Sequence, residues 1–151
     1  MLFIQQRLGK NQAIFRMIKF RTLSVRHELP LQERRFVLGD LLRVTNLDEL
    51  PQLWNVLKGE MSLVGPRPLP VEYQTKFSVE QNTRHRVKPG ITGLAQISGK
   101  NITPWSQKLE LDVKYVHQLS LKLDCLILLK TVTLVLSMKR DVSLNEQKFS
   151  G

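Results

Sequence analysis

The pattern of apolar and polar positions predicts β-structure near the start of the chain. Residues 3–8 and 13–20 are strand-like, and Gly9-Lys10-Asn11-Gln12 between them has the composition of a turn. Residues 61–64 form another short apolar segment, which is stopped by Gly65-Pro66-Arg67-Pro68. We therefore expect a β-hairpin over the first 21 residues and a separate short strand at 61–64.

Helical segments are expected between the hairpin and this strand. Residues 26–43 are rich in charge, and their apolar side chains cluster on one side, which favours one helix or two short helical pieces at a surface. Residues 46–58 carry the marks of a helix with defined ends. Asn46 or Asp48 can cap its start, and Gly59 follows its end.

The second half of the chain is expected to be mostly helical. Residues 69–87 are polar and helix-compatible, and the glycine-containing segment that follows predicts a loop with a short strand at 94–97. From residue 104 onwards apolar side chains recur at helix spacing. We expect an α+β fold that is mainly helical, with one domain over residues 1–138 and a polar, loosely held tail over residues 139–151.

The sign of the charge indicates the kind of partner. The chain has 23 Lys and Arg against 13 Asp and Glu, which gives a formal net charge of +10. This excess favours an anionic partner, such as nucleic acid, a phospholipid surface or a phosphorylated substrate, although a basic surface alone would also explain it. The single cysteine, Cys125, excludes an intrachain disulfide and is typical of a reducing compartment.

The chain shows neither a signal peptide nor an uncharged apolar run of membrane-spanning length. The nearest candidate is residues 119–138, which Lys122, Asp124 and Lys130 interrupt. We expect most of this helical segment to pack in the core. Its lysines could reach lipid headgroups, so we also expect membrane-associating helices that bind an anionic membrane surface weakly.

The most informative residues for chemistry are Asp48 and Glu49, two adjacent carboxylates at an expected helix start. Acidic residues at this position are commonly simple caps. Here, however, Arg43 lies five residues upstream of Asp48, and Arg67 follows in a proline-framed turn. A carboxylate nucleophile, a second carboxylate for a metal and arginines for phosphates form a coherent set for phosphoryl transfer.

Two other segments could contact phosphate. In Gly65-Pro66-Arg67-Pro68 the prolines restrict the backbone and could fix the direction of Arg67, although a surface arginine in a turn is the plainer interpretation. Pro89-Gly90-Ile91-Thr92-Gly93 could expose backbone N–H groups but matches no phosphate-binding fingerprint. The basic run Arg84-His85-Arg86-Val87-Lys88 is expected to be a solvated or phosphate-facing loop.

Several motifs occur together and in order along the chain. They are Lys19-Phe20-Arg21-Thr22, residues 45–59, residues 61–68, Arg84-His85, residues 88–93, Ala95-Gln96 and Leu111-Asp112-Val113. Together they closely resemble the bacterial sugar transferase family, the monotopic polyprenyl-phosphate phosphoglycosyl transferases. The resemblance extends from about residue 3 to residue 135.

The resemblance implies a transferase with a covalent intermediate. Asp48 would attack the sugar-linked phosphorus of a UDP-sugar, expel UMP and form an aspartyl phosphosugar, which polyprenyl (undecaprenyl) phosphate would then take over. Glu49 would hold Mg²⁺. Arg43 and Arg67 would bind phosphate groups, and the Pro66-Arg67-Pro68 turn would lie near the nucleotide. Residues 1–138 would be the catalytic domain.

The resemblance also implies a location. Members of this family begin with a hydrophobic helix that enters the membrane, and nothing at the start of this chain matches it. We therefore expect a chain truncated of its anchor, from a protein at the cytoplasmic face of the bacterial inner membrane that initiates glycan assembly. The expected partners are a UDP-sugar, polyprenyl phosphate and the anionic membrane surface, with no nucleic acid.

Two other functions compete with the transferase as explanations of this sequence. A basic nucleic-acid-binding module would explain the net charge, but it would leave the Asp48-Glu49 pair and the proline-framed turn unexplained. A non-catalytic scaffold on the membrane would use the basic face and the apolar segment 119–138. No zinc-ligand spacing is visible among the three histidines and the single cysteine.

Overall fold

The computed structural model describes residues 1–26, 28–30, 32–99 and 104–137. The chain begins with the predicted hairpin, in which β1 (Leu2–Leu8) pairs antiparallel with β2 (Ile14–Phe20). A short 3-10 segment, η1 (Lys10–Gln12), forms the turn. The predicted domain boundary at residue 138 and the predicted tail at 139–151 lie outside the described residues.

Alternation along β2 places two large side chains on the inner face of the hairpin. Phe15 and Met17 are buried, and they pack with Met61 in one of three core clusters. Asn55 is also fully buried beside this strand. Its amide nitrogen donates to the carbonyl oxygen of Arg16 at 2.8 Å, and its amide oxygen accepts from the backbone N–H of Ile18 at 3.2 Å. One polar side chain therefore fixes the following helix against the hairpin.

The region after the hairpin contains less helix than the sequence suggests. Helix α1 (Val37–Val44) forms, whereas the described residues of 26–36 adopt turns and a β-bridge, so the expectation of helix over residues 26–43 was only partly right. Residues 46–58 form two pieces, the 3-10 segment η2 (Leu47–Glu49) and helix α2 (Gln52–Leu57).

The break between η2 and α2 has a local cause. Pro51 stands at the start of α2, where its missing N–H costs no helical hydrogen bond. Asn46 adopts a left-handed conformation with φ of 55° and makes no side-chain cap, so its predicted capping role was wrong. Gly59 follows α2 with φ of 77°, as expected for the residue after a helix end.

A second, two-stranded sheet lies beside the hairpin. The predicted strand forms as β3 (Ser62–Val64), and it pairs in parallel with β4 (Gly90–Thr92). The backbones approach so closely that a Cβ atom on Gly90 would collide with the backbone of Gly65. The short strand expected at residues 94–97 was wrong, because these residues form helix α3 (Leu94–Ile97).

The rest of the chain is helical. Two 3-10 segments, η3 (Val71–Lys76) and η4 (Gln81–Arg86), replace the helix expected at 69–87, and α4 (Trp105–His117) and α5 (Leu121–Leu136) follow. The hydroxyl oxygen of Ser120 accepts from the N–H of Leu123 and caps α5. The α+β class, mainly helical with an N-terminal hairpin, is thus confirmed.

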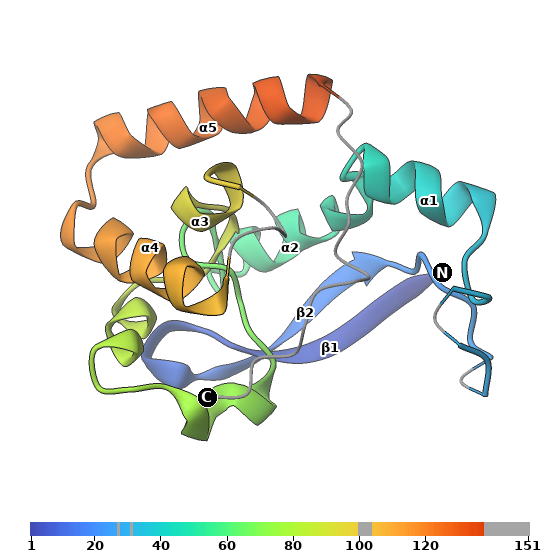
Figure 1. Cartoon of the computed structure of the whole chain (residues 1–151), viewed down its shortest axis with the longest axis horizontal. Coiled ribbons are helices and arrows are strands. Elements are labelled where there is room, and N and C mark those ends of the chain that lie inside the picture. Colours follow the sequence, from blue (N-terminus) through green and yellow to red (C-terminus); the bar gives the residue numbers. More distant parts are fainter. Residues whose placement is uncertain (27, 31, 100–103, 138–151) are drawn as a thin grey trace.

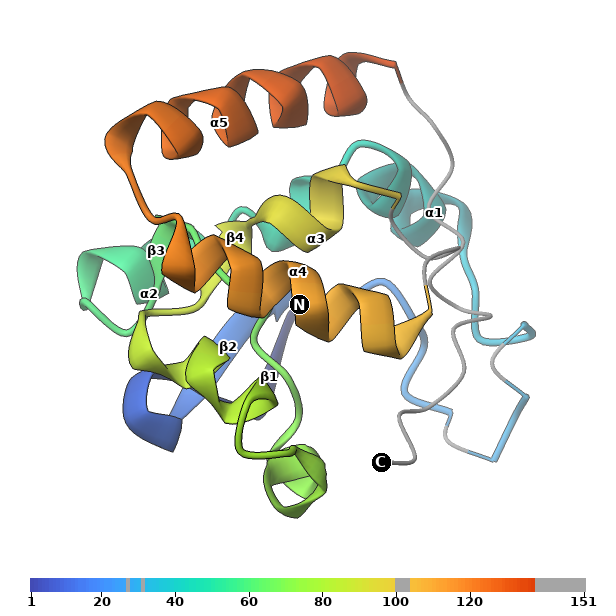
Figure 2. The same ribbon diagram turned by 60° about the vertical axis from the view of Figure 1, so that its left-hand side comes forward.

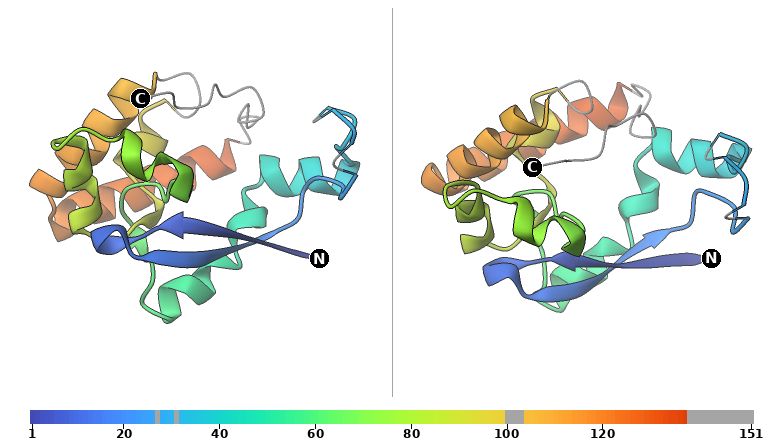
Figure 3. Two further views of the ribbon diagram at one scale, coloured as in Figure 1. Left: turned by 90° about the horizontal axis from the view of Figure 1, so that it is seen from below. Right: turned by 60° about the horizontal axis from the view of Figure 1, so that its bottom comes forward.

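Helix α5 and the hairpin lie on opposite sides of the molecule, with α2, α3 and α4 between them (Figures 1 and 2). Helix α1 stands at the other end of the molecule from α4 (Figure 3). A second core cluster joins the hairpin to η3 and α4 through Leu8, Tyr73 and Leu109. A third joins Val64, Tyr115 and Ile127, and it attaches α5 to the body of the protein.

The packing of α5 differs from the prediction. Ile127 is its fully buried residue, whereas Leu121, Leu129 and Leu136 are 81%, 70% and 76% exposed. The expectation that most of this segment packs in the core was therefore wrong. Among the described residues, no helix has the length and apolar character needed to cross a membrane.

Candidate active site

The two candidate carboxylates lie on the 3-10 segment η2. Asn46, in a left-handed conformation, precedes this segment, and Pro51 follows it at the start of α2. Asp48 and Glu49 therefore lie in one tight turn between these two residues. Both side chains are half-buried. Because Asn55 fixes α2 to β2, the turn that precedes α2 is held close to the hairpin.

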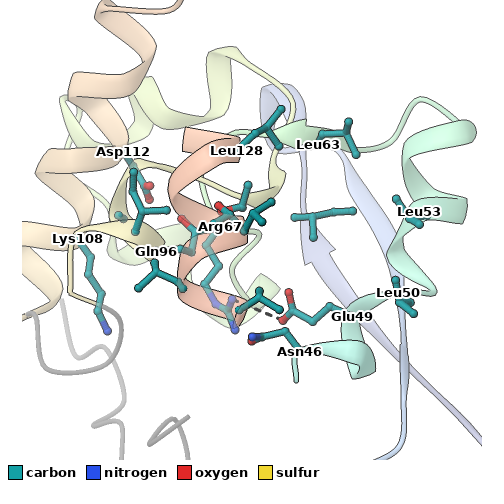
Figure 4. Close-up of a pocket in the computed structure, with 18 of the residues that line it drawn as sticks. Asn46, Glu49, Leu50, Leu53, Leu63, Arg67, Gln96, Lys108, Asp112 and Leu128 are labelled. Carbon is teal, nitrogen blue, oxygen red and sulfur yellow. Dashed lines mark hydrogen bonds and ion pairs between the residues drawn. The ribbon is translucent and has the colours of Figure 1, made fainter. Parts of the chain in front are cut away.

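Glu49 lies between two cations from distant parts of the chain. Its Oε1 atom is 2.5 Å from Nζ of Lys19, on β2, and 3.7 Å from a guanidinium nitrogen of Arg67 (Figure 4). The Lys19 and Glu49 side chains are only 15% and 17% exposed, whereas Arg67 is 46% exposed. Burial lowers the pKa of Lys19, and the charge of Glu49 opposes this shift.

The turn that carries Arg67 is held by hydrogen bonds to three consecutive carbonyl groups. The carbonyl of Pro66 accepts from the N–H of Gly90 at 3.0 Å, that of Arg67 accepts from Arg84 at 2.7 Å, and that of Pro68 accepts from Arg7 at 3.2 Å. Both prolines are buried, so the turn leaves the guanidinium of Arg67 directed outward from a fixed backbone.

The basic run that contains Arg84 is divided, since Arg86 and Lys88 are exposed but Arg84 and His85 are not. Arg84 and His85 are 2% and 6% exposed, so the expectation for these two residues was wrong. The Arg84 guanidinium donates through Nε and a terminal nitrogen to one carboxylate oxygen of Asp112, on α4, at 3.1 and 2.6 Å. Burial raises the pKa of Asp112, and the charge and hydrogen bonds of Arg84 act in the opposite direction.

The glycine-containing segment at residues 89–93 is also structural. The Gly90 N–H is used by Pro66, and the carbonyl of Thr92 accepts from the N–H of Gly65 at 2.9 Å. The hypothesis that this segment offers its backbone N–H groups to a phosphate is therefore wrong for Gly90. Its role is to place β4 against β3 at the base of the Arg67 turn.

Arg43 occupies a different environment from Arg67. It lies near the end of α1, and its Nε donates to the hydroxyl oxygen of Thr22 at 2.8 Å. Among the described residues no ion pair joins Arg43 to a carboxylate. The structure thus brings Glu49 and Arg67 into contact, keeps Asp48 adjacent in the chain, and holds Arg43 through a separate contact.

The sequence alone indicated no role for Lys19 or Asp112 at this site, and it indicated a different one for Arg84. Lys19 contacts Glu49 directly, and the Arg84–Asp112 pair holds the backbone of Arg67. All three fall within the motifs that carried the resemblance, which was the only available signal for them. Their partners lie 30 and 28 residues away, so local spacing could not have identified these contacts.

A pocket of about 620 Å³ adjoins the Glu49–Arg67 contact. Its walls are mainly apolar and come from η2, α2, α3, α4 and α5, including Leu47, Leu50, Leu53, Ile97, Trp105, Leu128 and Val132. Figure 4 shows Glu49 and Arg67 facing each other, with Lys108 and Asp112 on one side and Leu50, Leu53 and Leu63 on the other. The pocket therefore combines a charged edge with walls suited to hydrocarbon.

The chain is similar to several known proteins. An uncharacterized sugar transferase of Bacillus subtilis, EpsL, is 48% identical over 89% of this chain and 69% of the relative. A UDP-glucose:undecaprenyl-phosphate glucose-1-phosphate transferase of Caulobacter vibrioides is 37% identical over 90% of this chain and 57% of the relative. A UDP-galactose-lipid carrier transferase of Erwinia amylovora is 36% identical over 93% of this chain and 34% of the relative.

These matches cover between one third and just over two thirds of the relatives' own length. The family model for bacterial sugar transferases matches residues 1–138, which is nearly the whole chain. The resemblance seen in the motifs is thereby confirmed, and the chain belongs to the bacterial sugar transferase family.

Proposed function

We propose that this chain transfers a sugar-1-phosphate from a UDP-sugar to polyprenyl phosphate through a covalent intermediate on Asp48. The observation that carries the proposal is the contact of Glu49 with Arg67, next to Asp48, at the charged edge of a pocket with apolar walls. Relatives named for a UDP-sugar and a lipid carrier supply the substrate classes.

In the first step, a carboxylate oxygen of Asp48 would attack the phosphorus that carries the sugar. A bond forms between this oxygen and phosphorus, the phosphoanhydride bond breaks, and its electron pair leaves with UMP. Arg67 is well suited to bind the diphosphate, since a guanidinium matches phosphate geometry and its backbone is fixed on three carbonyl groups. Arg43 would bind phosphate through its terminal guanidinium nitrogens, because its Nε atom already donates to Thr22.

In the second step, a phosphate oxygen of the lipid would attack the same phosphorus and release Asp48. The polyprenyl chain needs an apolar environment while its phosphate reaches the charged edge. The leucine-rich walls from η2, α2 and α5 supply that environment beside Glu49 and Arg67. In both steps the residues mainly position the phosphorus and balance its charge.

The residues at this edge fit Mg²⁺ only with a substrate present. Carboxylates are ligands that Mg²⁺ prefers, and the ion is usually held by one or two of them together with substrate phosphates. Glu49, with Asp48 beside it, would supply the protein ligand, and the bound ion would offset charge on the diphosphate. Within the described residues no group of three or more His, Cys, Asp or Glu could hold a metal unaided.

We further propose that the chain works on the anionic, cytoplasmic face of the bacterial inner membrane. The acceptor phosphate lies at headgroup depth, and α5 exposes leucines together with Lys122 and Lys130. Each lysine near an anionic surface contributes roughly 1 kcal/mol. Co-sedimentation should show that the chain binds anionic vesicles more strongly than neutral ones, and that high salt weakens this binding. Binding that is equal on both vesicles and insensitive to salt would contradict the electrostatic part.

Replacing both Lys122 and Lys130 by Gln should weaken the binding to anionic vesicles about thirtyfold. Lys10→Gln is the matched control, because Lys10 is exposed at the hairpin turn, outside the pocket and outside α5. A loss of binding free energy for Lys10→Gln half as large as that of the double change would mean that net charge acts without any preference for α5.

The catalytic proposal is tested by release of UMP from UDP-sugars in the presence of polyprenyl phosphate. Asp48→Asn should abolish release while the circular dichroism spectrum and melting temperature stay close to those of the unaltered chain. EDTA should stop release, and added Mg²⁺ should restore it. Near-normal turnover of Asp48→Asn would refute the nucleophile, and full activity in EDTA would refute the metal requirement.

A further inference from the structure

The carboxylate of Glu49 already has two cationic side chains beside it before any ligand binds. Nζ of Lys19 lies 2.5 Å from Oε1, and the guanidinium of Arg67 lies 3.7 Å from the same oxygen. The Lys19–Glu49 pair is largely shielded from water, so its attraction is screened less than that of a surface pair. A metal ion approaching Glu49 would therefore meet a positive charge already in place.

The surroundings strengthen this effect. A small cavity of about 20 Å³ is lined by Glu49 and by three cationic side chains, Arg7, Lys19 and Arg67. Arg7 is held there by hydrogen bonds to the carbonyl of Pro68 and to Gln5. Among the residues that line this cavity, one carboxylate faces three cationic side chains, and Glu72 offsets part of the charge of Arg7, so a free divalent cation would meet an excess of positive charge there.

We propose that Lys19 acts as the counter-cation of Glu49 until substrate arrives, and that the divalent metal enters only together with a nucleoside diphosphate. This inference rests on the proposed function. The diphosphate brings negative charge for Lys19 and Arg67 and oxygen ligands for the metal. Glu49 then exchanges its contact with Lys19 for a contact with the metal. Metal and diphosphate consequently strengthen each other's binding, and the metal has no separate site of its own.

Equilibrium dialysis of the full chain with Mn²⁺ as the metal and UDP as the diphosphate tests this coupling. After subtraction of Mn²⁺ held by UDP in solution, the chain should bind Mn²⁺ about tenfold or more tightly with UDP than without it, as is usual for coupled sites. UMP, which lacks the second phosphate, should not replace UDP. Equal Mn²⁺ affinity with and without UDP, or no Mn²⁺ bound with UDP, would overturn the proposal.

A variant separates the role of Lys19 from that of the diphosphate. Lys19→Met removes the cation nearest to Glu49, leaving its contact with Arg67, and should raise the affinity for Mn²⁺ without UDP about tenfold. Lys19→Arg keeps the charge and should keep the dependence on UDP. Lys10→Met removes a charge from the same hairpin at its exposed turn, and it should behave like the unaltered chain.

Melting temperatures establish that each variant is folded. A folded Lys19→Met chain whose Mn²⁺ affinity without UDP is unchanged would overturn the inference. If Lys19→Met does not fold, the comparison with and without UDP in the unaltered chain and in Lys19→Arg still decides it. The proposed function has a separate test. If UDP strengthens Mn²⁺ binding but the chain releases no UMP from UDP-sugars, the proposed function fails and the coupling of metal and diphosphate remains.

Discussion

Two charge pairs in this molecule have the same chemistry but different surroundings. Arg84 and Asp112 are nearly inaccessible to solvent, with side chains 2% and 4% exposed, and Arg84 also donates to the carbonyl oxygen of Arg67. Lys19 and Glu49 line the small cavity of about 20 Å³, with side chains 15% and 17% exposed, and Glu49 also borders the larger pocket. The first pair borders the 620 Å³ pocket, but it mainly supports the fold, since neither charge can leave the other without being stranded. The second can exchange partners when a charged ligand arrives.

Asp112→Asn should produce the largest effect on stability. The change leaves the charge of Arg84 buried without a counter-charge, and we expect the free energy of unfolding to fall by about 3 kcal/mol. Urea unfolding measures this loss. Glu110→Gln, on the same helix but exposed, is the control and should change stability little. A loss below about 1 kcal/mol for Asp112→Asn would show that the interior pair is not structural.

Stability should also depend on pH through His85, which is buried next to Arg84 in the chain. Burial lowers the pKa of His85 to about 4, and the charge of Arg84 acts in the same direction. An unfolded histidine titrates near 6.5, so the unfolded chain binds this proton more readily. The stability contributed by neutral His85 is therefore complete above pH 6.5 and is lost as the pH falls toward 4.

Replacing this histidine by phenylalanine isolates its contribution. His85→Phe should remove about 2 kcal/mol of the decrease in unfolding free energy between neutral pH and pH 4.5. Phe77 already packs against the ring at 5.4 Å between centroids, so an aromatic replacement suits the site. Urea unfolding over this pH range provides the measurement. Parallel pH profiles for the two chains would contradict the assignment to His85.

Glu49→Gln should affect stability less than Asp112→Asn, although both changes replace a carboxylate by its amide. The Gln oxygen can still accept from Lys19, and the pair is less deeply buried than Arg84–Asp112, so we expect a loss of about 1.5 kcal/mol. UMP release, by contrast, should fall by about a hundredfold or more. Stability losses of equal size in the two variants would remove the distinction between the pairs.

Asp40→Asn should have the smallest effect. Asp40 pairs with Arg35 at 2.9 Å, but the side chains are 37% and 31% exposed. Exposed pairs of this kind contribute between about 0 and 1 kcal/mol, and we expect a loss near the lower end. The same unfolding measurement completes the series. A loss as large as that of Asp112→Asn would mean that burial does not govern these pairs.

The sequence predicted the elements whose signals are local. The hairpin follows from strand-like residues around a four-residue turn, and the end of α2 follows from Gly59. Residues 94–97 were placed in a strand because four residues carry too little pattern to separate a strand from a helical turn. The burial of α5 was misjudged for a related reason, since its leucines face several directions and periodicity does not show which neighbour covers them.

The candidate site was only partly accessible to sequence reasoning. Asp48, Glu49 and Arg67 could be selected from residue type and spacing, and the structure brings the last two into contact. The contact of Lys19 with Glu49 could not, because it depends on how the hairpin folds against η2. Arg84 is a similar case, since a basic run predicts exposure unless its distant acidic partner is known.

The central claim, a covalent intermediate on Asp48, is tested most directly by mass spectrometry of the protein after incubation with a UDP-sugar and Mg²⁺ without acceptor lipid. The account predicts an increase in intact mass equal to one phosphosugar, located on the peptide that contains Asp48. The adduct should be absent in Asp48→Asn and should disappear when polyprenyl phosphate is added. A chain that releases UMP and transfers the phosphosugar to the lipid acceptor, yet shows no adduct at Asp48 when the acceptor is withheld, would contradict the account.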